Sequence, residues 1–148
     1  MNPFSDEYFM KQALAEARLA AFEDEVPVGA VIVSGDRIIA RAHNQTEKLN
    51  DPTAHAEMLA ITSATTVLGA KYLTDCRLYV TVEPCVMCAG AIAWAQLAAL
   101  IYGATDEKRG FTRFAPNALH PETEVLSGIM EADCSALIKA FFQSKRNF

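Results

Sequence analysis

Cysteine and long apolar stretches are both scarce in this sequence. Its 148 residues include four cysteines, Cys76, Cys85, Cys88 and Cys134, which are too few and too unevenly spaced for a disulfide framework. No apolar run approaches the ~20 residues that cross a bilayer. The amino terminus lacks the charged and apolar regions of a signal peptide. We therefore expect a cytoplasmic protein with no membrane role.

Positive charge is scarce as well. The chain has 13 Lys and Arg against 18 Asp and Glu, a formal net charge of -5 at pH 7. Because Lys and Arg make most protein contacts to phosphate, this balance speaks against a broad nucleic-acid-binding surface. It leaves room for a local basic patch, through which any RNA contact should be sensitive to salt.

The order of the predicted elements favours an α/β protein. A chain of 148 residues with 51% hydrophobic content can form one compact domain, so we expect residues 1–148 to be a single domain. Ser5 and Thr53 are candidate helix caps, and Gly69 should end a helix. Helices alternating with strands indicate one sheet with helices on both faces. In chain order, we expect a helix over 6–21, a hairpin over 27–44, a helix over 54–70, a strand over 76–82, a helix over 84–96, a strand over 98–104, a loop over 105–122, a short strand over 123–129 and a helix over 131–146.

Cys85 and Cys88 follow Pro84, which suits the first position of a helix. A Cys-x-x-Cys pair can be a redox dithiol, half of a structural zinc site, part of a catalytic zinc site, or two buried small residues. A helix start stabilises a thiolate, so position alone does not exclude the redox dithiol. A structural zinc usually has four protein ligands, and neither Cys76 nor Cys134 has a second cysteine three positions away. A catalytic zinc takes three protein ligands, which requires one further ligand here.

The segment "TAHAEM" supplies a candidate in His55, followed two positions later by Glu57. Positions two apart diverge by about 200° around a helix, so both side chains reach one point only off its amino-terminal end. We therefore predict two helix starts converging on one zinc held by His55, Cys85 and Cys88. Zinc lowers the pKa of a bound water to about 7, and Glu57 is placed to carry protons. His-x-Glu followed by Pro-Cys-x-x-Cys is the signature by which zinc deaminases are recognised.

Longer segments extend this match. "HAE" and "EPCVMCAGAI" resemble the cytidine deaminase superfamily, and "VPVGAVIV", "DPTAHAEM", "IYGATDEKRG" and "SGIMEADCSALIKAFF" resemble its tRNA-specific adenosine deaminase branch. The resemblance covers nearly the whole chain. It implies a three-layer α/β/α sandwich with a mixed five-stranded sheet, one zinc ion per subunit, and a homodimer. It also implies hydrolytic deamination of adenosine to inosine at the wobble position of a tRNA anticodon, with Glu57 as the catalytic residue.

The resemblance also assigns substrate contacts. Asn44 matches the position whose amide hydrogen-bonds the base, Glu83 the position near the sugar and the zinc site, and Asp106 the position that contacts the nucleotide backbone. An amide suits a base edge because it offers a donor and an acceptor together. On the alternative interpretation, Asn44 is a turn residue that closes a strand and Asp106 is an exposed loop acid.

The segment "EKRGFTRF" interleaves cations with aromatic rings. Lys108, Arg109 and Arg113 are interleaved with Phe111 and Phe114. Because the bases of an anticodon loop are unpaired and can stack on aromatic rings, this composition suits binding of an RNA loop. The alternative is a solvated loop whose two phenylalanines cover the core. Further cations at the carboxyl end are Lys139, Lys145 and Arg146.

Three competing functions stay open. A deaminase of a free nucleobase such as guanine or cytosine would use the same zinc core. A binding module with a structural zinc would not need Glu57, and a thiol oxidoreductase would cycle Cys85 and Cys88 through a disulfide. Cys76 and Cys134 are expected to be ordinary buried thiols. The small residues of "AGAIAWAQLA" suit the close approach of helices at a dimer interface.

Overall fold

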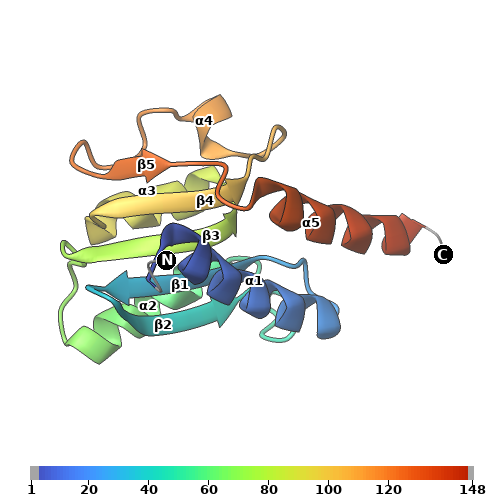
Figure 1. Cartoon of the computed structure of the whole chain (residues 1–148), viewed down its shortest axis with the longest axis horizontal. Helices are drawn as coiled ribbons and strands as arrows, with labels where there is room; N and C mark the ends of the chain where they lie inside the picture. Colours follow the sequence, from blue (N-terminus) through green and yellow to red (C-terminus); the bar gives the residue numbers. More distant parts are fainter. Residues whose placement is uncertain (1–3, 147–148) are drawn as a thin grey trace.

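A five-stranded sheet covered by helices organises residues 4–146, the range that the computed structural model describes (Figure 1). The strands are β1 (Gly29–Ser34), β2 (Arg37–His43), β3 (Cys76–Val82), β4 (Ala99–Ala104) and β5 (Glu124–Leu126). The helices are α1 (Asp6–Phe22), α2 (Ala56–Leu68), α3 (Val86–Ala95), α4 (Phe111–Phe114) and α5 (Glu131–Arg146). The ends of the predicted domain, 1–3 and 147–148, lie outside the described range.

The sheet is mixed. Its strand order is β2-β1-β3-β4-β5, with β1 antiparallel to β2 and β3, and β4 parallel to β3 and β5. The predicted α/β class with a mixed five-stranded sheet is confirmed. The loop expected over 105–122 contains the short helix α4, which the polar and proline-containing sequence did not reveal. Within the described residues, none of the helices has the length and apolar character needed to cross a bilayer.

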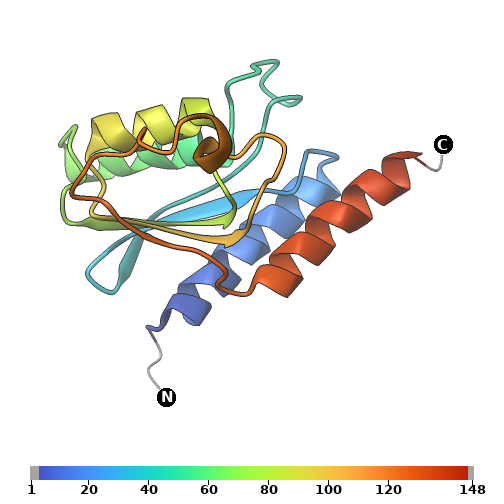
Figure 2. The same ribbon diagram turned by 90° about the horizontal axis from the view of Figure 1, so that it is seen from above.

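Each face of the sheet has its own apolar core, because side chains alternate along a strand. Helices α2 and α3 cover one face, and α1 and α5 cover the other (Figure 2). On β1, Ala30 and Ile32 belong to the core under α2 and α3, whereas Val31 and Val33 belong to the core under α1. Burial on both faces explains why β1 reads as an unbroken apolar run.

Local sequence signals set several helix ends. Oγ of Ser5 accepts the N–H of Tyr8 at 3.2 Å and caps α1, and Gly69 ends α2 with a left-handed φ of 65°. The expectation that Thr53 caps α2 is wrong. His55 holds that position, and Thr53 instead hydrogen-bonds to the side chain of Asp51. This difference places His55 at the very start of the helix.

The carboxyl ends of the parallel pair β3 and β4 lie at the same edge of the sheet as the starts of α2 and α3. β3 leads into Glu83 and the cysteine pair, and β4 leads into the loop that begins at Thr105. Ligand sites of open α/β sheets form at the carboxyl ends of the strands. The topology therefore brings His55, the cysteine pair and this loop to one place.

Candidate active site

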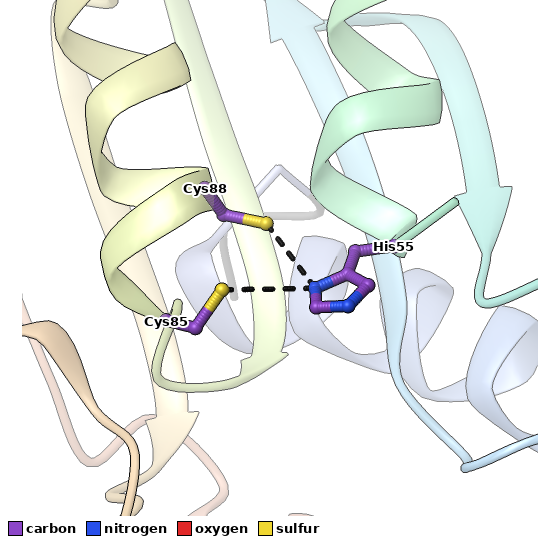
Figure 3. A group of neighbouring side chains, drawn as sticks. All are labelled: His55, Cys85 and Cys88. Atoms are coloured by element: carbon purple, nitrogen blue, oxygen red, sulfur yellow. Dashed lines mark hydrogen bonds between the residues drawn. The ribbon is translucent and has the colours of Figure 1, made fainter. Parts of the chain in front are cut away.

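Two helix starts bring three metal-ligating side chains together (Figure 3). His55 is the N-cap residue of α2, Cys85 is the N-cap residue of α3, and Cys88 lies in the first turn of α3. Nδ1 of His55 lies 3.7 Å from Sγ of Cys85 and 3.5 Å from Sγ of Cys88. Within the described range, these are the residues whose ligand atoms cluster, all within 4.8 Å of one another. The predicted convergence of two helix starts is confirmed.

The separations fit a tetrahedral zinc ion. With Zn–S bonds of ~2.3 Å and a Zn–N bond of ~2.05 Å, tetrahedral geometry puts nitrogen and sulfur about 3.6 Å apart. The observed distances of 3.5 and 3.7 Å lie on either side of that value. One imidazole and two thiols are also ligand types that zinc prefers. Three protein ligands leave the fourth position to water, as in a catalytic zinc site.

The His55 ring presents Nδ1 to the two cysteine sulfurs. Hydrogen bonding with Cys85 raises the pKa of His55.

The two thiols differ in how readily they ionise. Hydrogen bonding from Cys88 is the largest influence on Cys85 and, with a smaller one from His55, lowers the pKa of Cys85 to about 4. Hydrogen bonding with Cys85, together with burial, raises the pKa of Cys88 far above its ordinary range. At neutral pH without metal, Cys85 is therefore a thiolate and Cys88 keeps its proton.

Glu57 lies in the first turn of α2, beside the metal cluster but outside it. The residue is 4% exposed, and its burial raises the pKa of the carboxyl group to about 7. A carboxyl group that titrates near neutral pH can both accept and donate a proton at working pH. The geometry therefore supports the prediction that Glu57 carries protons.

The metal cluster opens into a groove of about 1070 Å³. Asn44, His55 and Glu57 line it at the cluster, and Ser135 and Phe142 of α5 line it farther out. The groove is as large as the biggest small-molecule pockets, so it can hold more than one nucleobase. The cations that line it are Lys108, Arg109, Lys139, Lys145 and Arg146.

Asn44 is buried at the end of β2 and lines the groove. Its Oδ1 accepts the N–H of Ala56 at 2.8 Å, one residue after the ligand His55. Because that N–H needs an acceptor, the amide is held with its oxygen toward α2 and its nitrogen free to donate. Asn44 thus orders the start of α2 and offers a donor to the groove.

Glu83 and Asp106 are occupied by hydrogen bonds from the loop after β4. The carboxylate of Glu83 accepts the N–H of Asp106 and both the N–H and Oγ–H of Thr112. The carboxylate of Asp106 accepts the N–H of Lys108 and of Arg109, each at 3.0 Å. Both acids line the groove, and their hydrogen bonds hold the loop that forms one of its walls.

The aromatic pair of this loop divides between core and surface. Phe111 is 2% exposed and packs edge-on against Tyr102. This burial corrects the expectation that the Phe111 ring contacts the substrate. Phe114 is 62% exposed, with the guanidinium of Arg113 lying 5.4 Å from its ring centre. Of the two rings, Phe114 is the one that can stack on a base.

Helix α5 forms a wall of the groove that the sequence did not reveal. Glu131, Ser135, Ile138 and Phe142 line the groove along the length of α5. The sequence shows an amphipathic helix with basic residues at its carboxyl end, but not which neighbour that helix faces. Its basic residues were the one feature of the sequence that indicated a role for α5 at the groove.

Comparison with known proteins gives a consistent result. Residues 3–104 match the family model described as the cytidine and deoxycytidylate deaminase zinc-binding region. A tRNA-specific adenosine deaminase of Agrobacterium fabrum is 45% identical over 144 residues, which cover 94% of this chain and 95% of the relative. A solved structure from a study of A-to-I editing by tRNA:A34 deaminases has a TM-score of 0.83 and 45% identity, over 88% of this chain and 98% of its own. A guanine deaminase of Bacillus subtilis has a TM-score of 0.67 and 35% identity, over 97% of this chain and 95% of its own.

The chain belongs to the cytidine and deoxycytidylate deaminase family, whose zinc-binding region contains the His55, Cys85 and Cys88 cluster. Within that family it groups with the tRNA-specific adenosine deaminases, which it matches over nearly its full length. The resemblance noted from the sequence motifs is confirmed.

Proposed function

We propose that this protein hydrolyses adenosine to inosine, with release of ammonia, at the wobble position of a tRNA anticodon. The observation that carries the proposal is the zinc-ligand cluster with a buried carboxyl group beside it. High identity to tRNA-specific adenosine deaminases supports the substrate. The groove supports it too, because it continues past the cluster toward cationic residues of α5.

The residues divide the chemistry between them. His55, Cys85 and Cys88 would hold zinc, which when bound supplies an activated water for hydrolysis. Glu57 accepts a proton from the attacking water and gives it to a ring nitrogen of the base; it then accepts the proton of the new hydroxyl at C6 and gives it to the amine, which leaves as ammonia. The Asn44 amide donates to the base and orients it. Catalysis therefore depends on Glu57 cycling between its two protonation states.

The cations suit a polynucleotide better than a free base. Lys108 and Arg109 lie exposed on the loop after β4, and Lys139 and Lys145 lie on α5, with all four lining the groove. A free base carries no phosphate and gains nothing from these charges, whereas the phosphates of an RNA loop can pair with them. Phe114 is exposed on the same loop, beside the Arg113 guanidinium, and offers a surface for stacking.

A direct substrate comparison tests the proposal. Zinc-loaded protein is incubated with an anticodon stem-loop that has adenosine at the wobble position, and separately with free guanine, cytosine and adenosine. A stem-loop whose adenosine is moved by one nucleotide is the matched control. We expect inosine only in the first RNA, measured by nuclease digestion and mass spectrometry. Ammonia released from a free base, with no inosine in either RNA, would assign the protein to the free-base deaminases instead.

We also propose that the protein is a homodimer through α3. Trp94 is 81% exposed, and Val86 and Met87 on the same helix are also exposed. Covering such an apolar helix surface requires a partner, and the small residues of α3 permit close approach. Light scattering should give twice the chain mass, and Trp94→Glu should give the mass of one chain. A monomeric wild-type protein at micromolar concentration would contradict this.

The remaining proposals concern the whole chain. The four cysteines are free, which suits a reducing compartment, so we propose that the protein acts in the cytoplasm. We also propose that residues 1–148 act as one deaminase domain. A single cooperative unfolding transition, seen alike by fluorescence and circular dichroism, would support one domain. Two separate transitions would contradict it.

A further inference from the structure

Glu83 is a buried carboxylate whose oxygens are both occupied by one loop. The residue is 4% exposed and stands at the end of β3, two positions before the metal-ligating Cys85. Its Oε1 accepts the N–H of Asp106 at 3.1 Å. Its Oε2 accepts the N–H of Thr112 at 3.0 Å and the Oγ–H of the same residue at 2.7 Å. Few acceptor positions remain on this carboxylate for a substrate.

These bonds hold the base of a compact turn, residues 105–112, which we name the anchored loop. Inside it, the Asp106 carboxylate accepts the N–H of Lys108 and of Arg109, and the Asp106 carbonyl accepts the N–H of Gly110 at 2.9 Å. The two cationic side chains therefore project from a closed hydrogen-bonded turn. Their position depends on what fixes the turn to the rest of the protein, and the Glu83 carboxylate accepts three of the hydrogen bonds that do so.

Close packing at Gly110 confirms how tightly the anchored loop sits on Glu83. A Cβ atom at Gly110 would lie 2.3 to 2.5 Å from the carboxylate atoms of Glu83, nearer than any real contact. Beside it, the N–H of Phe111 donates to the Pro84 carbonyl at 2.9 Å, and Gly110 pairs with Cys85 in an isolated β-bridge. The loop is thus pressed directly against the segment that carries the metal ligand.

We infer that Glu83 is a positioning residue, which sets the place of the anchored loop relative to the zinc ligands and so places Lys108 and Arg109 for the RNA. It acts through the loop and does not contact the substrate itself, in contrast to the role that the sequence resemblance suggested. A carboxylate suits this task because charge-assisted bonds to N–H and O–H donors are about twice as strong as neutral ones. The inference rests on the proposed function only in taking RNA as the ligand of those cations.

The test uses the zinc-loaded protein and variants on both sides of the contact. Glu83→Gln replaces one acceptor oxygen by an amide donor, and Thr112→Val removes the hydroxyl donor at nearly constant shape. Thr112→Ser keeps the hydroxyl and is the rescue control. Glu107→Gln changes an exposed acid of the same loop and is the control for charge. Zinc content, trypsin cleavage after Lys108 and Arg109, and kinetics on the stem-loop are measured for each.

For Glu83→Gln and Thr112→Val we expect unchanged zinc content and cleavage after Lys108 and Arg109 about tenfold faster, because the loop opens more often. KM for the stem-loop should rise about tenfold with kcat nearly unchanged, the pattern of lost binding without lost chemistry. Thr112→Ser and Glu107→Gln should behave as wild type. General destabilisation, by contrast, would speed cleavage at all sites alike.

Several results would overturn the inference. If Glu83→Gln lowers kcat at unchanged KM while Thr112→Val is silent, Glu83 acts at the reacting atoms. If Glu83→Gln loses zinc, the residue supports the metal and not the loop. If cleavage after Lys108 and Arg109 is unchanged in both variants, the anchored loop does not depend on Glu83. Because proteolysis involves no RNA, it decides the positioning role even if the stem-loop proves not to be a substrate.

Discussion

Replacing Glu57 by glutamine should abolish activity and yet stabilise the metal-free protein at alkaline pH. A positioned general acid and base contributes about 10² to 10⁴ in rate, so E57Q should lose at least about a hundredfold in kcat. Zinc content should not change, because Glu57 lies outside the His55, Cys85 and Cys88 cluster. Glutamine keeps the size of the side chain and leaves no cavity. The two effects therefore come from the loss of a titrating group.

The stability effect follows from burial of the carboxyl group. Burial is the largest influence on Glu57, and it raises the pKa from 4.5 to about 7. Since the folded-state pKa is raised, the stabilising contribution is complete below pH 4.5 and is lost as the pH rises through about 7. A difference of about 2.5 pH units, at about 1.4 kcal/mol each, makes that loss roughly 3 kcal/mol. E57Q cannot ionise at this position and should not show the loss.

The assay is urea unfolding of chelator-treated wild type and E57Q at a series of pH values from 5 to 8.5. The gap in unfolding free energy should be small at pH 5 and should widen in favour of E57Q, reaching roughly 3 kcal/mol above pH 7.5. Glu107→Gln, at an exposed position, should show no such trend. A gap that does not change with pH would refute the claim that burial holds the proton on Glu57. Retained turnover in E57Q would refute its role as proton carrier.

Other consequences of the structure can be checked as directly. The hydrogen bond with Cys85 is the first cause of the raised pKa of Cys88, so zinc must displace a proton from Cys88 when it binds. The apparent zinc affinity, measured by competition with a chelator, should therefore rise about tenfold per pH unit near neutrality. Gly29→Ala should destabilise the fold by about 2 to 3 kcal/mol in urea unfolding, because its Cβ would lie 2.0 Å from the Ala13 carbonyl oxygen. Lys108→Ala should weaken stem-loop binding and reduce the slope of log K against log salt by about 1. An unchanged slope would show that Lys108 does not contact a phosphate.

The zinc ligands and Glu57 could be predicted from the sequence because their geometry is nearly all local. Two cysteines three apart at a helix start must share a face, and a His-x-Glu pair at another start can meet only beyond its end. The convergence of the two helix starts was inferred from the ligand set, because three ligands of one zinc must meet at one point.

The surroundings of the site could not be predicted because their partners are distant in the chain. Glu83 bonds to Thr112, 29 positions later, and that contact exists only because β3 and β4 are parallel neighbours. Phe111 and Phe114 are the same residue type and lie close together in the sequence, yet Phe111 is buried and Phe114 is exposed. The turn of α4 decides between them, and no pattern in the loop sequence indicated that turn.

Glu25, Glu57 and Glu83 are buried carboxylates with different tasks, and their hydrogen-bond partners distinguish those tasks. Glu25, 1% exposed, accepts N–H groups of loop residues 47–48, and Glu83 likewise holds a loop through backbone donors. For Glu57 the cost of burial outweighs its hydrogen bonds, and the pKa rises to about 7. A carboxylate that holds a loop acts through its acceptor oxygens, whereas one that moves protons must be able to gain and lose a proton. The same change to glutamine should therefore have opposite effects on stability at neutral pH: a loss of about 1 to 3 kcal/mol at Glu25, and a gain at Glu57.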